Sequence, residues 1–173
     1  MLRAGDSRLP NSPHSIPLMN ARKLKVLFVC IRNSSRSQMA EAWANHLCRD
    51  IAEADSAGLE PGTLNPLVVE VMKEEGIDIS GKSTKSVMDL FKTGHKYDRV
   101  ISVCDQDSAE RCPLFPGSTV RLHWNFEDPS RFEGTKVEKL NKTRAVRDEI
   151  RAQVLAWRQD ESAVLAQAEA HMH

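Results

Sequence analysis

The chain has 173 residues, which is enough for one domain with a proper hydrophobic core and too few for two comfortable ones. Its 24 Lys and Arg residues balance its 24 Asp and Glu residues, so no global charge excess recruits nucleic acid or a membrane surface. Because no apolar stretch approaches the ~20 residues that span a bilayer and no continuous apolar run marks a secretory signal, we expect a cytoplasmic protein.

The first half of the chain alternates predicted strands with predicted helices. Residues 1–22 contain three prolines and no hydrophobic periodicity, a composition that predicts a mobile leader. The β-rich run 23–30 predicts a buried strand, and apolar residues at helical spacing predict a helix over 37–49. A short strand is expected over 51–57. The helix expected over 65–76 has an Asn-Pro start and a glycine at its end.

The second half continues the alternation with shorter elements. Residues 87–91 predict a short helix and residues 97–103 a strand. The stretch 105–118 is rich in Pro and Gly and predicts a long polar loop with room for some helix. A fourth strand is expected over 118–124, followed by another loop over 125–133.

A strong helical stripe begins at about Lys142, and the pattern thins beyond Gln159. We therefore expect the α/β domain to span 23–159 and residues 160–173 to form a helix extension or a tail. The alternation predicts a three-layer α/β fold, with a four-stranded parallel sheet and helices on both faces. In such sheets, ligands gather at the carboxyl ends of the strands.

The stretch from Cys30 to Arg36, Cys-Ile-Arg-Asn-Ser-Ser-Arg, lies where the first strand turns into the first helix. The first N–H groups of a helix lack partners within it and the helix dipole is positive there, so a thiolate or an oxyanion is favoured. Arg36 offers a planar fork to a tetrahedral oxyanion, and Ser37 can donate its hydroxyl to the sulfur. Cys30 is thus a candidate nucleophile, the alternative being a buried structural thiol. The residues expected to bind the anion are Ile31, Arg32, Asn33, Ser34, Ser35, Arg36 and Ser37.

Two further reactive side chains are expected at the same edge of the sheet. Cys104 ends the third predicted strand and Asp128 lies just beyond the fourth, so both converge on Cys30 without any metal being needed. Asp-Pro also starts ordinary turns, which leaves Asp128 a purely structural alternative. Cys104 and Cys112 are either a redox pair or bystanders. A zinc site is disfavoured because the sequence has no Cys-x2-Cys motif.

The spacing of Cys104 and Cys112 predicts a conformational change if the two are paired. Were residues 104–112 helical, their α-carbons would stand about 12 Å apart, whereas a disulfide tolerates at most ~7 Å. Oxidation would therefore have to unwind this segment.

Several separated motifs resemble one family. The stretch Val29-Cys30-x-x-Asn33-Ser34-x-Arg36-Ser37-Gln38-Met39-Ala40-Glu41 resembles the phosphate-binding loop of the low-molecular-weight tyrosine phosphatase superfamily, and within it the thioredoxin-coupled arsenate reductases. Further stretches resemble those reductases in the same order: Ser56-Ala57-Gly58, Asn65-Pro66, Cys104-Asp105, Cys112-Pro113 and His123-Trp124-x-Phe126-x-Asp128-Pro129. The resemblance runs from about residue 24 to 157.

The resemblance implies a reaction and its participants. Cys30 is expected to attack arsenate at arsenic, with Asp128 as the general acid for the departing oxygen. Cys104 then attacks Cys30 to release arsenite, and Cys112 resolves that bond, leaving a Cys104/Cys112 disulfide for thioredoxin to reduce. Phosphate and sulfate are expected to act as analogues of the substrate, and no tightly bound cofactor is implied.

Some family members bind potassium behind the loop, at positions that match Asn33, Glu41 and Ser56. In this sequence Lys85 could place an ammonium there instead, so potassium remains open.

Two loop positions depart from the family pattern, because Arg32 stands where glycine is usual and Ser35 where cysteine is frequent.

Two alternative functions are open. A tyrosine phosphatase would use Cys30, Arg36 and Asp128 in the same roles through a phosphocysteine, but it would leave the other two cysteines without a task. A non-catalytic anion-sensing module would have kept the fold while Arg32 spoiled the loop.

Overall fold

The computed structural model describes residues 22–117 and 119–171. The leader predicted for residues 1–22 therefore lies, apart from its last residue, outside the described residues. Four strands form one sheet in the order β2-β1-β3-β4, with every neighbouring pair parallel. The strands are β1 (Leu24–Cys30), β2 (Ala52–Gly58), β3 (Arg99–Ser102) and β4 (Val120–His123).

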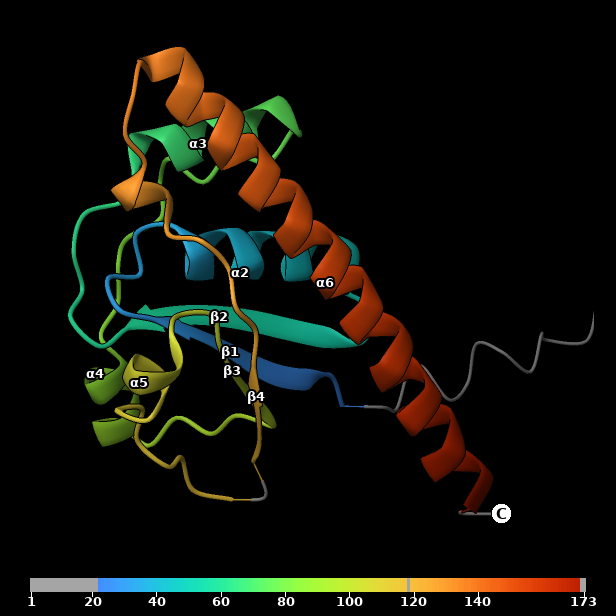
Figure 1. Ribbon diagram of the computed structural model, residues 1–173. Helices are drawn as coiled ribbons and strands as arrows, with labels where there is room; N and C mark the ends of the chain where they lie inside the picture. The colour runs from blue at the N-terminus through green and yellow to red at the C-terminus, as the bar shows by residue number, and fades with distance from the viewer. Residues whose placement is uncertain (1–21, 118, 172–173) are drawn as a thin grey trace, which may run out of the picture.

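Helices cover both faces of this sheet, which confirms the predicted three-layer α/β fold (Figure 1). On one side lie α2 (Arg36–Leu47), α3 (Pro66–Glu74) and α6 (Lys136–His171). On the other side lie the short helices α4 (Val87–Lys92) and α5 (Gln106–Ala109). A 3-10 turn, η1 (Pro129–Arg131), connects β4 to α6. No helix in the described ranges is long and apolar enough to cross a membrane.

The central strand β1 has a buried side chain on each face, as its continuous apolar run predicts. Val26 and Phe28 belong to the larger core, which α2, α3 and α6 close. Leu27 and Val29 belong to a smaller core on the opposite face, under α4. The alternation places Cys30 at the carboxyl end of β1, at the edge of the larger core.

Helix α6 departs most from the sequence prediction. It begins at Lys136 rather than near Lys142, because Thr135 provides the start: its hydroxyl accepts the N–H of Glu138 at 3.2 Å. The first turn is polar and therefore carries no apolar stripe. At the other end the helix continues to His171, past its last buried residue, Glu161. Figure 1 shows this end projecting beyond the sheet.

Candidate active site

The residues 30–37, here called the anion loop, are held from behind by the chain that follows β2. Four loop carbonyls accept N–H groups from that chain, at 2.7–3.0 Å: Cys30 from Leu59, Ile31 from Glu60, Arg32 from Gly62 and Ser34 from Asn65. The carbonyl and N–H groups of one peptide stretch cannot all point the same way in a tight loop. With the carbonyls occupied on the outside, the N–H groups remain for an oxyanion on the inside.

Gly58 permits this close approach. It pairs with Cys30 in the β1–β2 register. A Cβ at this position would stand 2.7 Å from the Ile31 carbonyl oxygen and 2.9 Å from the backbone of Arg32 and Asn33. Any side chain would therefore push the loop away from β2, which explains glycine here better than a need for turn flexibility does.

Asn33 locks the shape of the loop. Its backbone has a φ of 55°, in the left-handed region that asparagine tolerates better than most residues. Its amide nitrogen donates to the hydroxyls of Ser37 at 2.7 Å and Ser56 at 2.9 Å. Its amide oxygen accepts from Gln38 at 3.1 Å and from the N–H of Lys85 at 3.0 Å. All of its hydrogen-bonding capacity is used, so the buried side chain fixes the strained backbone.

The sulfur of Cys30 receives two polar contacts. The N–H of Asn33 donates to it at 3.1 Å, and the Ser37 hydroxyl lies 2.8 Å away. Since the Asn33 amide already donates to Ser37, the hydroxyl hydrogen of Ser37 is left to point at the sulfur. Both contacts point a donor at the sulfur, the atom that would act as the nucleophile.

Arg36 and Asp128 meet over the loop, as the topology predicts. The Arg36 side chain is 8% exposed, donates to the Phe126 carbonyl at 3.2 Å and stands 3.6 Å from the Asp128 carboxylate. Asp128 also accepts the N–H of Ser130 and so begins η1, as the turn alternative predicts. A small cavity of about 10 Å³ lies between them and is lined by Cys30, Ile31, Arg32, Ser34, Ser35, Arg36 and Asp128. Of the predicted anion-binding residues, all but Asn33 and Ser37 line the cavity, and those two contact the Cys30 sulfur instead.

Next to this cavity lies a wider vestibule of about 360 Å³. Its lining residues are Arg36, Asp105, Asn125, Phe126, Glu127, Asp128, Arg131 and Phe132. Sequence reasoning assigned no role to most of these residues. They meet because the loop after β4 folds back over the carboxyl edge of the sheet, which spacing along the chain does not reveal.

Cys104 and Cys112 are both buried and unpaired, as are the other two cysteines. Cys104 packs in the larger core and Cys112 in the smaller one, so the two thiols lie in different cores. Burial and the nearby charge of Cys30 raise the pKa of the Cys104 thiol to about 11, against the opposing effect of Arg36. Burial also raises the pKa of Cys112, against the effect of Arg121.

Behind the loop, two lysines approach a buried carboxylate. Glu41 is 3% exposed and accepts the Ser56 hydroxyl at 3.2 Å. The ammonium groups of Lys82 and Lys85 each stand 3.9 Å from Glu41, and Lys85 also pairs with Asp55. Burial raises the pKa of Glu41, and the two lysines oppose that shift. The contribution of Lys82 was not predicted, because no local pattern links residue 82 to residue 41.

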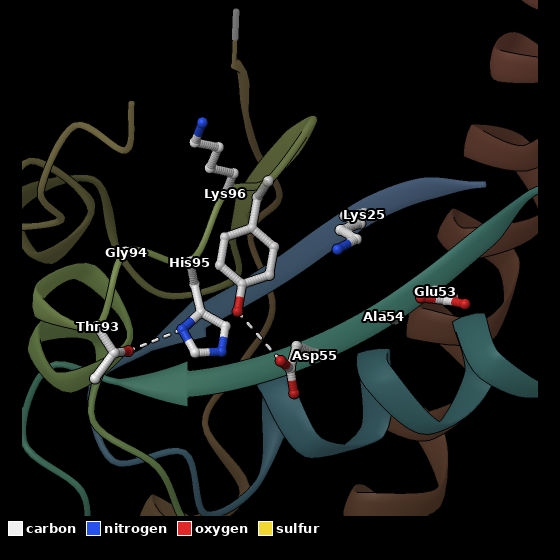
Figure 2. Close-up of a pocket in the computed structure, with 9 residues that line it drawn as sticks. Lys25, Glu53, Ala54, Asp55, Thr93, Gly94, His95 and Lys96 are labelled. Carbon is white, nitrogen blue, oxygen red and sulfur yellow. Dashed lines mark hydrogen bonds between the residues drawn. The ribbon is translucent and has the colours of Figure 1, made fainter. Parts of the chain in front are cut away.

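No cluster of three or more His, Cys, Asp and Glu residues suited to a metal occurs in the described part of the chain. A larger cavity of about 600 Å³ lies at the other end of the sheet, beside Lys25 and Glu53 near the starts of β1 and β2. Figure 2 shows this cavity, with Asp55, Thr93 and His95 among the residues that line it. The Tyr97 hydroxyl donates to Asp55 at 3.1 Å. Since Cys30 ends β1, this cavity is separate from the anion loop.

The geometry defines a class of protein in which a thiol at a strand-to-helix turn acts on a tetrahedral oxyanion held by loop N–H groups and one arginine. The chain belongs to the low molecular weight phosphotyrosine protein phosphatase family, whose sequence profile matches residues 25–167. This confirms the resemblance noted from the motifs.

Within that family, the chain is similar to several arsenate reductases, both in sequence and in structure. An arsenate reductase of Shouchella clausii (strain KSM-K16) is 43% identical over 130 residues, which cover 75% of this chain and 91% of the relative. An arsenate reductase solved in the phosphate binding state matches with a TM-score of 0.64 at 32% identity, over 80% of this chain and 98% of that one. An arsenate reductase solved in the oxidized state matches with a TM-score of 0.66 at 33% identity, over 79% of this chain and 97% of that one.

Proposed function

We propose that this protein is an arsenate reductase that works through an adduct on Cys30 and a disulfide between Cys104 and Cys112. One observation carries the proposal: a second buried thiol follows β3 beside the nucleophile. Val29 pairs with Ser102 in the sheet, and the N–H of Val103 donates to the Val29 carbonyl at 2.8 Å. Cys104 therefore leaves the sheet next to Cys30, where a phosphatase has no use for it.

In the first step the Cys30 thiolate attacks arsenic. The loop N–H groups and the Arg36 guanidinium hold the remaining oxygens and stabilise the charge that builds on them. Asp128, over the same cavity, donates a proton to the departing oxygen, which leaves as water. A sulfur–arsenic bond forms and an arsenic–oxygen bond breaks.

In the second step the Cys104 thiolate attacks the sulfur of Cys30. The electron pair of the sulfur–arsenic bond passes to arsenic, which leaves as arsenite, while the two sulfurs are oxidised to a disulfide. Because the charge of Cys30 is one cause of the high pKa of Cys104, capture of Cys30 by arsenic removes one obstacle to this step. Cys112 then attacks Cys104 and releases Cys30 as a thiolate.

The last step needs a partner and a movement. The thiols lie in different cores, so the segment between them must rearrange before they can join. We propose thioredoxin, a protein dithiol, as the reductant of the resulting disulfide, and the cytoplasm as the compartment in which it works. Amide exchange over residues 104–117 should be faster in the oxidised protein, and equal rates in both forms would exclude the rearrangement.

We further propose that the reaction needs no tightly bound cofactor and no potassium. The ammonium groups of Lys82 and Lys85 already face the buried Glu41 carboxylate. Arsenate reduction should then proceed at the same rate in potassium and sodium salts of equal ionic strength.

An assay with arsenate, thioredoxin, thioredoxin reductase and NADPH tests the function. NADPH oxidation should depend on arsenate and should be lost in Cys30→Ser, Cys104→Ser and Cys112→Ser. Cys48→Ser is the matched control, because Cys48 is equally buried but lies at the far end of α2. In a single turnover without thioredoxin, Cys112→Ser should still release arsenite and accumulate a Cys30/Cys104 disulfide. Arsenate-dependent activity that is lost in Cys30→Ser would exclude the anion-sensing alternative. Activity retained in Cys30→Ser would exclude the proposal.

A phosphatase activity is the second candidate, because the vestibule beside Asp128 has room and two phenylalanines for the leaving group of an ester. It would use Cys30, Arg36 and Asp128 through a phosphocysteine. Hydrolysis of an aryl phosphate should survive in Cys104→Ser, whereas arsenate reduction should not. A chain that hydrolyses the ester and never reduces arsenate would favour this candidate.

A further inference from the structure

Arg32 is the residue of the anion loop that the proposed mechanism does not use. Arg32 lines the small cavity together with Cys30 and Arg36, yet the residue is exposed. Its backbone is fixed, because its carbonyl accepts the N–H of Gly62 at 2.9 Å. A fixed backbone and an exposed tip place a charge at the mouth of the site rather than within it.

The aliphatic stem of Arg32 lies against the backbone of Gly62. A Cβ on Gly62 would stand 3.2 Å from the Cδ of Arg32 and 3.5 Å from its Cβ. Gly62 itself is held in place, since the Thr84 hydroxyl donates to its carbonyl at 2.6 Å. The missing side chain of Gly62 thus leaves room for the stem of Arg32 to pack against the Gly62 backbone.

The guanidinium of Arg32 has no ion-pair partner among residues 22–117 and 119–171. Two acidic residues beside the anion loop are engaged elsewhere. Glu60, whose N–H binds the Ile31 carbonyl, pairs with Arg111 at 3.0 Å. Asp128, which lines the same cavity, stands 3.6 Å from Arg36. An arginine next to occupied acids keeps its positive charge available to an incoming anion.

We propose that Arg32 is a specificity-determining residue, a second guanidinium that captures doubly charged tetrahedral oxyanions at the mouth of the anion loop. The inference rests on the proposed function for its choice of substrate but concerns binding alone. Because an exposed charge acts on the approach and not on the reacting bond, Arg32 should set KM and leave kcat nearly unchanged. A dianion gains twice the interaction energy of a monoanion at the same place.

The test measures protection of Cys30 from alkylation by iodoacetamide, followed by peptide mass mapping, so that it needs no catalysis. Sulfate and perchlorate are the probes, since both are tetrahedral but only sulfate is doubly charged. In Arg32→Gln the protection constant of sulfate should weaken about tenfold and that of perchlorate about threefold, the square root expected from half the charge. Arg32→Lys should retain most of the sulfate affinity.

Arg49→Gln is the matched control. Arg49 is also exposed, but it follows the carboxyl end of α2, at the opposite end of the helix from the anion loop. It removes the same charge and should leave both constants unchanged. Since exposed charges are screened over about 10 Å at 0.1 M salt, the difference between Arg32→Gln and the parent should shrink as an inert salt is added.

Two variants test whether the position of Arg32 matters and whether its side chain merely obstructs the site. Gly62→Ala keeps the charge but crowds the stem of Arg32, and should weaken sulfate protection by about two- to threefold without the loss of charge. Arg32→Gly restores the small residue usual at this position. If it bound sulfate more tightly or reduced arsenate with a higher kcat than the parent, Arg32 would be an obstruction and the proposal would fall.

The proposal and the proposed function fail in different ways. Equal sulfate protection in Arg32→Gln and the parent at low salt overturns the role of Arg32, whatever the reductase assay shows. Sulfate protection that depends on Arg32 in a protein that never reduces arsenate supports the anion-capture role and rejects the function. In the active enzyme, a rise in the KM for arsenate with kcat within about twofold supports the role, and a fall in kcat alone contradicts it.

Discussion

The anion loop and the segment of residues 104–117, here called the redox segment, meet at the same edge of the sheet but are built differently. The loop has four carbonyls bound by the chain after β2, and Asn33 fills its remaining space with four side-chain hydrogen bonds. The redox segment contains one helix of four residues, and Asp105 is the side chain that starts it, through Ser108.

The difference separates two tasks. An oxyanion site works best when its donors are already in place, because no reorganisation is then needed as charge develops. A disulfide relay needs thiols that travel, and segments with few buried contacts open at low cost. In the proposed mechanism, one reactive cysteine stands on a fixed support and two stand on a segment that must leave its cores.

The largest effect on the anion loop is expected from a substitution at Gly58. Gly58→Ala places a Cβ 2.7 Å from the Ile31 carbonyl oxygen, so the backbone of the anion loop must shift to admit it. We expect a loss of about 3 kcal/mol in the free energy of unfolding, measured by urea denaturation, together with loss of oxyanion protection of Cys30. Gly117→Ala, in the redox segment, meets no atom within 4 Å and carries only the strain of its φ of 98°, about 1 kcal/mol. Equal losses in the two variants would contradict the contrast.

Asn33→Ala tests the same contrast through a side chain. It removes one hydrogen bond from each of several buried partners, Gln38 and Ser56 among them, at a cost of about 2 kcal/mol in unfolding free energy. The counterpart, Asp105→Ala, removes the start of α5 and should cost about 1 kcal/mol. Single-turnover arsenite release should fall about 100-fold in Asn33→Ala, because the loop loses the geometry of its donors. A fall of the same size in Asp105→Ala would show that the redox segment is fixed as well.

The pH dependence of the relay follows from Cys104. Its thiol has a pKa of about 11 in the free protein, and burial, the larger cause, persists when arsenic captures Cys30. Well below the pKa, the thiolate fraction rises about tenfold for each unit of pH. Single-turnover release of arsenite should therefore accelerate by about tenfold per unit between pH 7 and pH 9, as long as the attack of Cys104 limits the rate. Rapid quenching and arsenic speciation measure this step. A rate that stays level over this range would show that the thiol is activated in some other way.

The sequence predicted the scaffold well, because strands and helices alternate and are marked by clear punctuation. Asn65 and Pro66, for example, begin α3 as expected, with the Asn65 side chain accepting the N–H of Leu67 at 3.0 Å. The start of α6 was missed because its first turn is polar and depends on a single cap, Thr135. Hydrophobic periodicity predicts elements that have an apolar stripe, but it does not predict a helix start that depends on one hydrogen bond.

The site was predictable where residues sit at the ends of strands, and not where distant loops meet. Cys30, Cys104 and Asp128 were placed at one edge by topology alone, and the structure brings them there. Two other contacts depend on how loops pack, and residue spacing along the chain does not predict them. They are the contact of the Arg32 stem with Gly62 and the ion pair of Lys82 with Glu41. The sequence also could not show that Cys104 and Cys112 lie in different cores.

The smallest effect is expected where the two regions touch. Glu60, beside the anion loop, pairs with Arg111, in the redox segment, and both side chains are more than half exposed. An exposed pair contributes about 0.5 kcal/mol at most, so Glu60→Gln should barely change global stability. It does hold the redox segment against the fixed loop, and its loss should speed formation of the Cys104/Cys112 disulfide by about twofold at low salt.

The matched control for this pair is Glu70→Gln, which removes an exposed ion-pair partner of Lys136 between α3 and α6. Disulfide formation is followed by free-thiol counting after a pulse of a small disulfide oxidant. Because the effect comes from an exposed pair, it should vanish at about 1 M salt, where charges are screened over about 3 Å. An acceleration that persists at high salt, or that Glu70→Gln reproduces, would mean that the segment is released by something other than this contact.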